Sequence, residues 1–140
     1  VKSSELYGIN VPNNLVSLSI DELPLIFLAA ACANGTTTIR NATELRFKES
    51  DRIQAMAKLL SQLSIEVEEL KDGLIINGGI ITGGEIDSFG DHRVAMTALV
   101  ASASSTSDIL VHNTENIDTS FPNFVKTMNQ LGMDIIDPDN

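Results

Sequence analysis

The chain has 140 residues, 43% of them hydrophobic, which is enough for one folded domain with a core of its own. Its formal net charge is −10 at pH 7, and its isoelectric point is about 4.4. This acidic balance argues against nucleic acid and anionic membranes as partners, although local cations can still bind a small anion. No apolar run approaches the roughly 20 residues that span a bilayer, and no signal peptide is recognisable, so we expect a cytoplasmic protein.

The chain opens with a pattern of short extended segments. Residues 3–10 are typical of a strand, with Gly8 as a point where another backbone comes close. Residues 11–14 predict a turn, and residues 15–20 predict a short extended piece.

The apolar run 25–33 predicts a buried helix. Asp21 can cap it, Pro24 is tolerated in its first turn, and Asn34 followed by glycine ends it. The single cysteine, Cys32, has no partner for an internal disulfide and lies in this apolar run, which predicts a buried, unreactive thiol.

The next segments predict a strand, a helix and a hairpin. The β-branched run 36–39 indicates a strand. Apolar residues then recur at helical spacing in a helix that closes near Ser64, at Ile53, Met56, Ala57, Leu60 and Leu63. Residues 65–70 alternate as a half-buried strand, residues 71–73 indicate a hairpin turn, and residues 74–77 form the returning strand.

The sequence of the second half of the chain predicts fewer strands than that of the first half. Residues 78–90 form a glycine-rich connector with a strand around 85–87, followed by a helix over 91–104 and a strand over 108–112. A further amphipathic helix, ending at Gly132, is indicated by Phe121, Phe124, Val125, Met128 and Leu131. Residues 133–136 predict a final strand.

One stretch, residues 45–53, concentrates charge where a loop turns into a helix. Its charged residues are Arg46, Lys48, Glu49, Asp51 and Arg52. Ser50 can cap the helix, and Asp51 suits the positive end of the helix dipole. Taken alone, the stretch fits a solvated, salt-bridged helix start better than a ligand site.

A chemical interpretation of the same stretch is also open. Lys48 and Arg52 are four residues apart and would share one face of a helical start. Two cations beside free backbone N–H groups can bind an anion, and Glu49 between them could move a proton near it.

A second stretch strengthens the chemical interpretation. Gly90-Asp91-His92-Arg93 precedes the apolar run 94–101, so a capping acid and a cation again lie at a helix start. Together the two stretches resemble the enolpyruvyl transferases, most closely the 3-phosphoshikimate 1-carboxyvinyltransferase (EPSP synthase) family. That family shows Leu-Arg-x-Lys-Glu-Ser/Thr-Asp-Arg-Ile and Gly-Asp-His-Arg-x-Ala-Met, which stand here at 45–53 and 90–96. The resemblance runs from about Ser3 to Gly132 and covers the C-terminal third of a family enzyme.

The sequence also repeats. Asp21 and Asp91 both precede apolar helices and lie 70 positions apart, and residues 62–67 resemble residues 130–135. Each half therefore predicts one copy of a strand–helix–strand–helix–strand unit of about 70 residues.

The resemblance implies an α+β fold that explains this repeat. Family lobes are built from three βαβαββ units, with buried parallel helices and the sheets outside, as an inside-out α/β barrel. Residues 1–140 would then be part of the C-terminal lobe, with the first unit at 1–78 and the second at 79–140. The third unit and the N-terminal lobe would be missing, so we expect a longer natural gene product and an exposed apolar patch on this chain.

The resemblance further implies a reaction that needs no metal or cofactor. Family enzymes move the enolpyruvyl group of phosphoenolpyruvate to the 5-hydroxyl of shikimate 3-phosphate, releasing phosphate. Two catalytic residues carry over: Glu49 exchanges a proton with the methylene carbon, and Asp21 binds and deprotonates the hydroxyl.

The binding residues carry over in the same way. Arg52 and Arg93 match the guanidiniums that clamp phosphoenolpyruvate, because a planar fork binds a carboxylate or phosphate through two parallel bonds. Lys48 matches a lysine that contacts shikimate 3-phosphate. His92 either supports this site or makes a hydrogen bond at the helix start. We expect the converging helix starts to make the site electropositive.

Two departures from the family pattern affect binding rather than the assignment. Some members have Lys-Thr-Phe-Pro, whose lysine contacts phosphoenolpyruvate, where this chain has Thr119-Ser120-Phe121-Pro122. Some members also have an asparagine that contacts substrate where this chain has Glu44.

Two alternatives to the leading assignment stay open. One is a UDP-N-acetylglucosamine enolpyruvyl transferase-like enzyme, which the two motifs disfavour. The other is a noncatalytic binding module of the same fold, which would not need all of the acidic and basic groups. Because the other lobe would supply most of the shikimate 3-phosphate site, we expect this chain alone to be inactive.

Overall fold

The structure is a computed structural model that describes residues 2–137. Its helices are α1 (Asn13–Leu18), α2 (Leu23–Ala31), α3 (Arg52–Gln62), α4 (His92–Ala101), α5 (Ile117–Ser120) and α6 (Phe124–Gln130). Its strands are β1 (Thr36–Ile39), β2 (Glu66–Leu70), β3 (Gly73–Asn77), β4 (Gly84–Asp87) and β5 (Ile109–His112). Short 3-10 helices occupy Ile20–Glu22, Thr43–Phe47 and Ser102–Ser104. The α+β prediction is therefore confirmed. Among the described residues, no helix is both long and apolar enough to cross a membrane.

The first half of the chain builds a three-stranded antiparallel sheet in the order β1-β3-β2. The tight turn between β2 and β3 confirms the predicted hairpin. Residues 3–10 lie extended beside β1 and the loop before it. They pair with this segment at isolated points, with Tyr7 opposite Asn34 and Asn10 opposite Thr38, both parallel. Gly8 is needed there, because a Cβ at this position would lie 2.3 Å from the carbonyl oxygen of Thr36.

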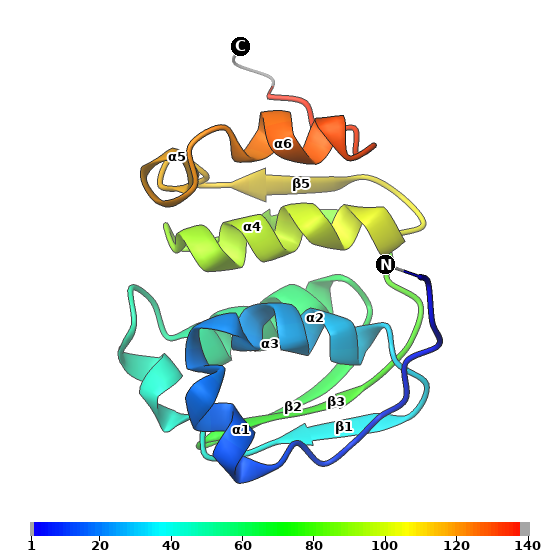
Figure 1. Cartoon of the computed structure of the whole chain (residues 1–140), viewed down its shortest axis with the longest axis vertical. Helices are drawn as coiled ribbons and strands as arrows, with labels where there is room; N and C mark the ends of the chain where they lie inside the picture. The colour runs from blue at the N-terminus through cyan, green and yellow to red at the C-terminus, as the bar shows by residue number, and fades with distance from the viewer. Residues whose placement is uncertain (1, 138–140) are drawn as a thin grey trace.

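The second half builds a smaller sheet of two parallel strands, β4 and β5. A parallel pair needs a crossover connection, and α4 provides it. In Figure 1, α4, β5 and α6 form the upper part of the molecule, above α2, α3 and the larger sheet.

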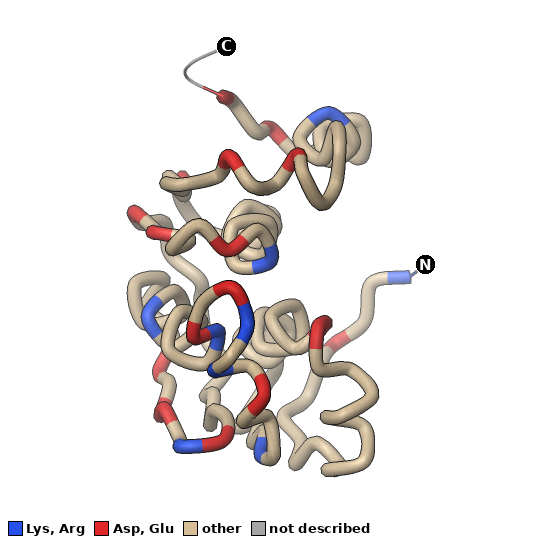
Figure 2. The backbone as a smooth tube through the Cα atoms, turned by 90° about the vertical axis from the view of Figure 1, so that its left-hand side faces the viewer, with Lys and Arg blue, Asp and Glu red and all other residues tan. Residues whose placement is uncertain are grey.

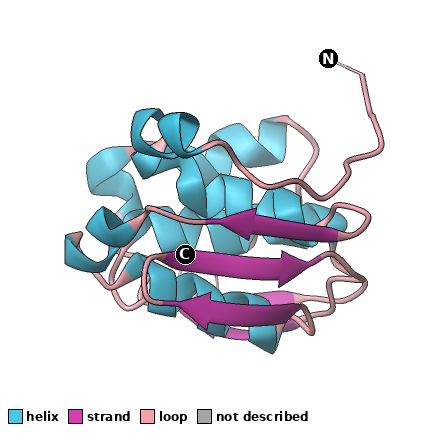
Figure 3. Ribbon diagram, turned by 90° about the horizontal axis from the view of Figure 1, so that it is seen from below, coloured by secondary structure: helices cyan, strands magenta, loops and turns pink. Residues whose placement is uncertain are grey.

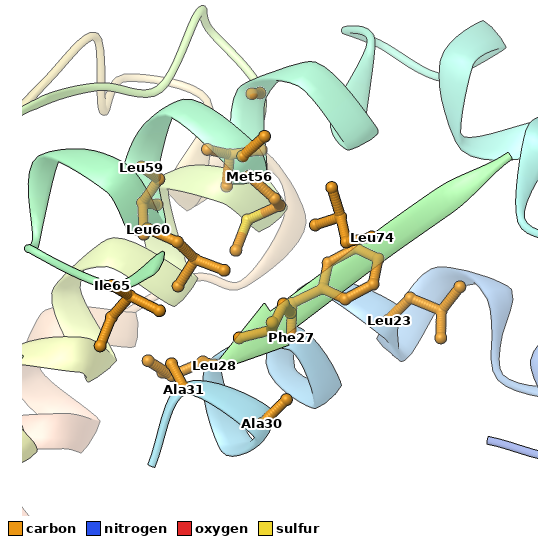
Figure 4. Packing of buried hydrophobic residues seen from close by; sticks show 14 of the residues in the cluster. Leu23, Phe27, Leu28, Ala30, Ala31, Met56, Leu59, Leu60, Ile65 and Leu74 are labelled. Atoms are coloured by element: carbon orange, nitrogen blue, oxygen red, sulfur yellow. The ribbon is translucent and has the colours of Figure 1, made fainter. Parts of the chain in front are cut away.

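Three helices have their first turns at the same end of the molecule. Figure 1 shows α2, α3 and α4 side by side and running in the same direction, so that their first turns lie at one end. Figure 3 shows the molecule from the side of the strands, with the helices behind them. Phe27 of α2, Met56 of α3 and Leu74 of β3 are fully buried and converge between helices and sheet (Figure 4). The helix starts are thus held by one continuous core.

Two local predictions are wrong. Residues 15–20 are not extended, since α1 covers most of them. Pro12, whose φ of −59° suits a helix start, immediately precedes α1. Val16 is the buried residue of this short helix. Residues 133–136 do not form a strand, because the backbone N–H and C=O of Ile135 bond to the side chain of Asn129 instead.

The α2 helix is not buried all round. Leu25, Ala29 and Cys32 are exposed at a spacing of four and three residues, so they form one outward stripe. The prediction of a buried Cys32 is therefore wrong, since an apolar run does not say which side of a helix is covered. Large apolar side chains are also exposed on the segment before α2, in keeping with the expected open face, at Leu6, Ile9, Leu15 and Leu18.

Candidate functional site

Side chains from three separate segments meet at the common end of α2, α3 and α4. Asp21 comes from the 3-10 helix before α2, Glu49 and Arg52 from the start of α3, and Arg93 from the first turn of α4. Figure 2 faces this end and shows positive and negative residues close together there. The structure thus brings together the four residues on which the chemical interpretation depends.

Arg52 lies at the centre of this cluster. Its side chain is only 1% exposed, yet all three nitrogens donate to carboxylates. Nε donates to Asp91 Oδ2 at 2.8 Å, Nη1 to Asp21 Oδ1 at 3.2 Å, and Nη2 to Glu49 Oε2 at 2.5 Å. Charge-assisted bonds on every side fix both the position and the plane of the guanidinium.

Asp91 is the fully buried acid of the cluster. Its Oδ1 accepts the backbone N–H of Arg93 at 2.9 Å and that of Val94 at 3.4 Å, so it caps α4 as predicted. Its Oδ2 accepts from Arg52 and from the hydroxyl of Ser50 at 3.0 Å. Four donors compensate for the burial of this charge.

Lys48 lies on the solvent side of Arg52. Its Nζ is 2.6 Å from Glu44 Oε1 and 3.4 Å from Asp21 Oδ1. The residue precedes α3 in extended backbone, so the predicted helical face shared with Arg52 does not exist. The two cations meet instead at the same oxygen of Asp21.

Arg93 and His92 occupy the first turn of α4. Arg93 Nη1 donates to the backbone carbonyl of Asp21 at 2.8 Å and lies 3.4 Å from Glu22 Oε1. The ring of His92 makes no hydrogen bond within residues 2–137, so neither of the two roles expected for it has a contact here.

The cations depress the pKa values of the acids. Desolvation raises the pKa of Asp21, but Lys48, Arg93 and Arg52 together outweigh it and hold the pKa below its ordinary value. Desolvation likewise raises the pKa of Asp91, and the bonds from Arg52, Ser50 and the Arg93 N–H lower it further than burial raises it. Both carboxylates are therefore ionised at neutral pH.

The sequence-based expectation of an electropositive site is wrong, because carboxylates outnumber cations in the cluster. It contains three cations, Lys48, Arg52 and Arg93, against five carboxylates, from Asp21, Glu22, Glu44, Glu49 and Asp91. An incoming anion must therefore replace carboxylates on the guanidiniums. Glu49 and Asp21 are the replaceable ones, with side chains 53% and 47% exposed.

The surrounding surface is open. One hollow of about 570 Å³ lies elsewhere, between the outer side of α3 and the loop after β4, and no residue of the cluster lines it. No group of three or more His, Cys, Asp or Glu that could hold a metal ion occurs within residues 2–137. The cluster therefore lies on an open surface and not in this hollow.

Two cap predictions are wrong. Asp51 caps α3 by accepting the N–H of Gln54, so the hydroxyl of Ser50 is free to bond Asp91. Asp21 caps nothing, because α2 has no side-chain cap, and its carboxylate is turned toward Lys48 and Arg52 instead.

Sequence reasoning missed the contacts that Asp91 makes with Arg52 and with the hydroxyl of Ser50. The only local signal was the presence of these polar residues at two helix starts. Arg46 binds Asp51 and Glu69 and so ties the β2–β3 hairpin to the start of α3. Thr119, where some family members have lysine, donates to the carbonyl of Asn116 within its own turn.

The comparisons with known proteins decide the family. The family described as EPSP synthase (3-phosphoshikimate 1-carboxyvinyltransferase) matches residues 2–128. The chain belongs to the EPSP synthase family. The 3-phosphoshikimate 1-carboxyvinyltransferase of Legionella pneumophila (strain Paris) is 50% identical over 135 residues, which are 96% of this chain and 31% of the relative. The 3-phosphoshikimate 1-carboxyvinyltransferase of Methylococcus capsulatus is 49% identical over 135 residues, again 96% of this chain and 31% of the relative.

Solved structures agree with this EPSP synthase match. An EPSP synthase from Acinetobacter baumannii superposes with a TM-score of 0.87 at 45% identity, covering 90% of this chain and 30% of that one. A second structure of EPSP synthase from Acinetobacter baumannii also gives a TM-score of 0.87, at 40% identity and 95% and 32% coverage. The chain thus spans about 31% of the length of the curated relatives it matches. These relatives are 3-phosphoshikimate 1-carboxyvinyltransferases, which favours the shikimate enzyme over the UDP-sugar alternative.

Proposed function

We propose that this chain supplies one half of the active site of a 3-phosphoshikimate 1-carboxyvinyltransferase. The enzyme transfers the enolpyruvyl group of phosphoenolpyruvate to the 5-hydroxyl of shikimate 3-phosphate and releases phosphate. The observation that carries the proposal is the meeting of Asp21, Glu49, Arg52 and Arg93 at one end of three helices. This gathering places two carboxylates and two guanidiniums at one surface, as the reaction requires.

The chemistry assigns one proton transfer to each exposed carboxylate. In the addition step, the 5-hydroxyl oxygen bonds to C2 of phosphoenolpyruvate while C3 gains a proton. In the elimination step, C3 loses a proton and the C2–O bond to phosphate breaks. Glu49 in its acid form gives the proton to C3 and takes one back in the elimination step, while Asp21 accepts the hydroxyl proton, which then leaves with the departing phosphate. The lowered pKa of Asp21 means that its carboxylate carries no proton of its own at neutral pH before the substrates bind.

The guanidiniums bind the anionic groups of phosphoenolpyruvate. Arg52 directs Nη1 and Nη2 toward the exposed acids Asp21 and Glu49. Arg93 is held next to this group because its Nη1 donates to the backbone carbonyl of Asp21. Phosphoenolpyruvate would replace the Asp21 and Glu49 carboxylates on Arg52, which releases both acids for their proton transfers. Lys48, now held by Glu44 and Asp21, would turn to the phosphate of shikimate 3-phosphate. His92 is assigned a supporting role beside them.

The chain also fits part of the family's C-terminal lobe. We assign residues 1–78 and 79–140 to two βαβαββ units of an inside-out α/β barrel; Val1 and residues 138–140 lie outside the described residues. The assignment is supported by a shared pattern, since a helix links two parallel extended segments in each half. Within residues 79–137, the second unit contains the strands β4 and β5. The N-terminal lobe of the enzyme would supply the opposite wall, in the cytoplasm as expected from the sequence.

A binding experiment on the 140-residue chain tests the site directly. Shikimate 3-phosphate and glyphosate, the family's inhibitor, are titrated into 15N-labelled chain, and backbone amide shifts are followed. Perturbations at the starts of α2, α3 and α4 are expected, and the 3-10 helix Ser102–Ser104 at the opposite end of α4 should not respond. Shifts confined to other surfaces would refute the proposed site.

A graft tests the activity. This chain replaces the matching 30% of the Acinetobacter baumannii EPSP synthase, and phosphate release is measured with both substrates. The graft should turn over, whereas the isolated 140 residues should not. Glu49→Gln and Arg93→Ala in the graft should each lower kcat/KM by ~10²-fold or more while circular dichroism stays unchanged. Full activity in either variant would remove that residue from the mechanism.

A further inference from the structure

Asp91 is a buried, ionised carboxylate to which the proposed reaction assigns no role, and it connects the Arg52 guanidinium with the backbone at the start of α4. Oδ2 accepts from Nε of Arg52, and Oδ1 accepts from the backbone N–H of Arg93. The carboxylate is fully buried, and its partner Arg52 is 1% exposed, so neither group can turn toward water. One carboxylate therefore sets how far the α3 guanidinium lies from the first turn of α4.

The hydroxyl of Ser50 completes this arrangement. Ser50 Oγ donates to Asp91 Oδ2 at 3.0 Å, the same oxygen that holds Arg52. Without the hydroxyl, Oδ2 would keep Arg52 as its single donor, and the carboxylate plane would be held only by Arg52 and by the two backbone N–H bonds to Oδ1 at 2.9 and 3.4 Å. A shift of Oδ2 would carry the Arg52 side chain with it, because the Nε bond is short and charge-assisted.

The two edges of Arg52 face different surroundings. Nε points to the buried Asp91, whereas Nη1 and Nη2 point to the half-exposed acids Asp21 and Glu49. We propose that Ser50 is a positioning residue of the phosphoenolpyruvate clamp: through Asp91, it fixes the Nε edge of Arg52 so that the two Nη nitrogens face the ligand. The placement of Arg52 stands on geometry alone, and its consequence for affinity rests on the proposed function.

The positioning is tested by NMR of the arginine Nε–Hε groups in the 140-residue chain. Ser50→Ala should shift the Arg52 Nε–Hε signal and speed its exchange with water about tenfold or more, because the accepting oxygen is no longer fixed. Ser50→Thr keeps a hydroxyl and should restore both values. The matched control is Ser102→Ala, which removes a hydroxyl bond to Leu99 at the far end of α4 and should leave Arg52 unchanged.

The consequence for binding is tested in the grafted enzyme. Ser50→Ala should raise KM for phosphoenolpyruvate about tenfold, with a smaller change in kcat. A tenfold change is at the lower end of the effect expected when a hydrogen bond to a charged group is lost. Ser50→Thr should return KM to within about twofold.

The outcomes separate the two proposals. An Arg52 signal that is unaffected by Ser50→Ala, or that Ser50→Thr does not restore, overturns the positioning role. An altered Arg52 signal with an unchanged KM overturns its link to the clamp. A graft that is inactive with the unaltered chain overturns the proposed function, while the NMR measurement still decides whether Ser50 positions Arg52.

Discussion

The starts of α3 and α4 are similar in sequence and different in construction. Each has an aspartate cap followed within two residues by an arginine, Asp51 with Arg52 and Asp91 with Arg93. Asp51 faces outward and pairs with Arg46, whereas Asp91 is fully buried and pairs with Arg52 of the other helix. As a result the Arg52 side chain is 1% exposed and that of Arg93 is 32% exposed.

This difference divides the work between the two arginines. Arg52 is anchored on one edge by a buried acid, so its position is set before any ligand arrives. Arg93 is held by one backbone carbonyl and a long contact with Glu22, so it can adjust to a ligand. A fixed and an adjustable guanidinium together can both orient an anion and close on it.

The largest expected effect separates the two arginines by stability. Arg52→Met should lower the free energy of unfolding by about 3–5 kcal/mol, because it leaves the buried Asp91 carboxylate without its cation. Arg93→Met should cost less than about 1 kcal/mol, since its ion pair is partly exposed. Urea unfolding followed by circular dichroism measures both. Equal losses would mean that the two helix starts are not built differently.

A medium effect is expected at the outward cap. Asp51→Ala should lower the free energy of unfolding by about 1–2 kcal/mol, because the N–H of Gln54 loses its acceptor. Asp51→Asn keeps an acceptor oxygen and should cost less than half as much, which makes it the matched control. If Asp51→Asn is as damaging as alanine, the pairing with Arg46 rather than the cap is what stabilises this start.

The smallest expected effect is on the loss of stability at acidic pH. The pKa of Asp91 is lowered below its ordinary value of 3.8, despite desolvation, by Arg52, Ser50 and the Arg93 N–H. Its stabilising contribution is therefore complete above about pH 4 and is lost as the pH falls through the lower folded-state pKa. Asp91→Asn should flatten the decline of the urea midpoint below pH 4. The exposed Asp108→Asn serves as control, and equal slopes in the two variants would contradict this role of Asp91.

Much of the local structure followed from the sequence. The β-branched run at Thr36–Ile39, the β2–β3 hairpin and the apolar spacing of α3 were predicted correctly, because each depends on residues close in the chain. Both charged motifs were correctly placed at helix starts for the same reason. The terminal segment after Gly132 was predicted wrongly as a strand, since alternation cannot show that no partner strand is within reach.

The sequence by itself determined which groups are available at the helix starts: two capping aspartates, two arginines, a lysine and a glutamate. Only the tertiary structure decided their partners. Arg52 and Asp91 are 39 positions apart, and nothing local distinguishes Asp91 from Asp51 as the acid that Arg52 binds. Helix packing makes that choice, because it buries one cap against the neighbouring helix, where its charge requires a cation, and leaves the other partly exposed beside Arg46.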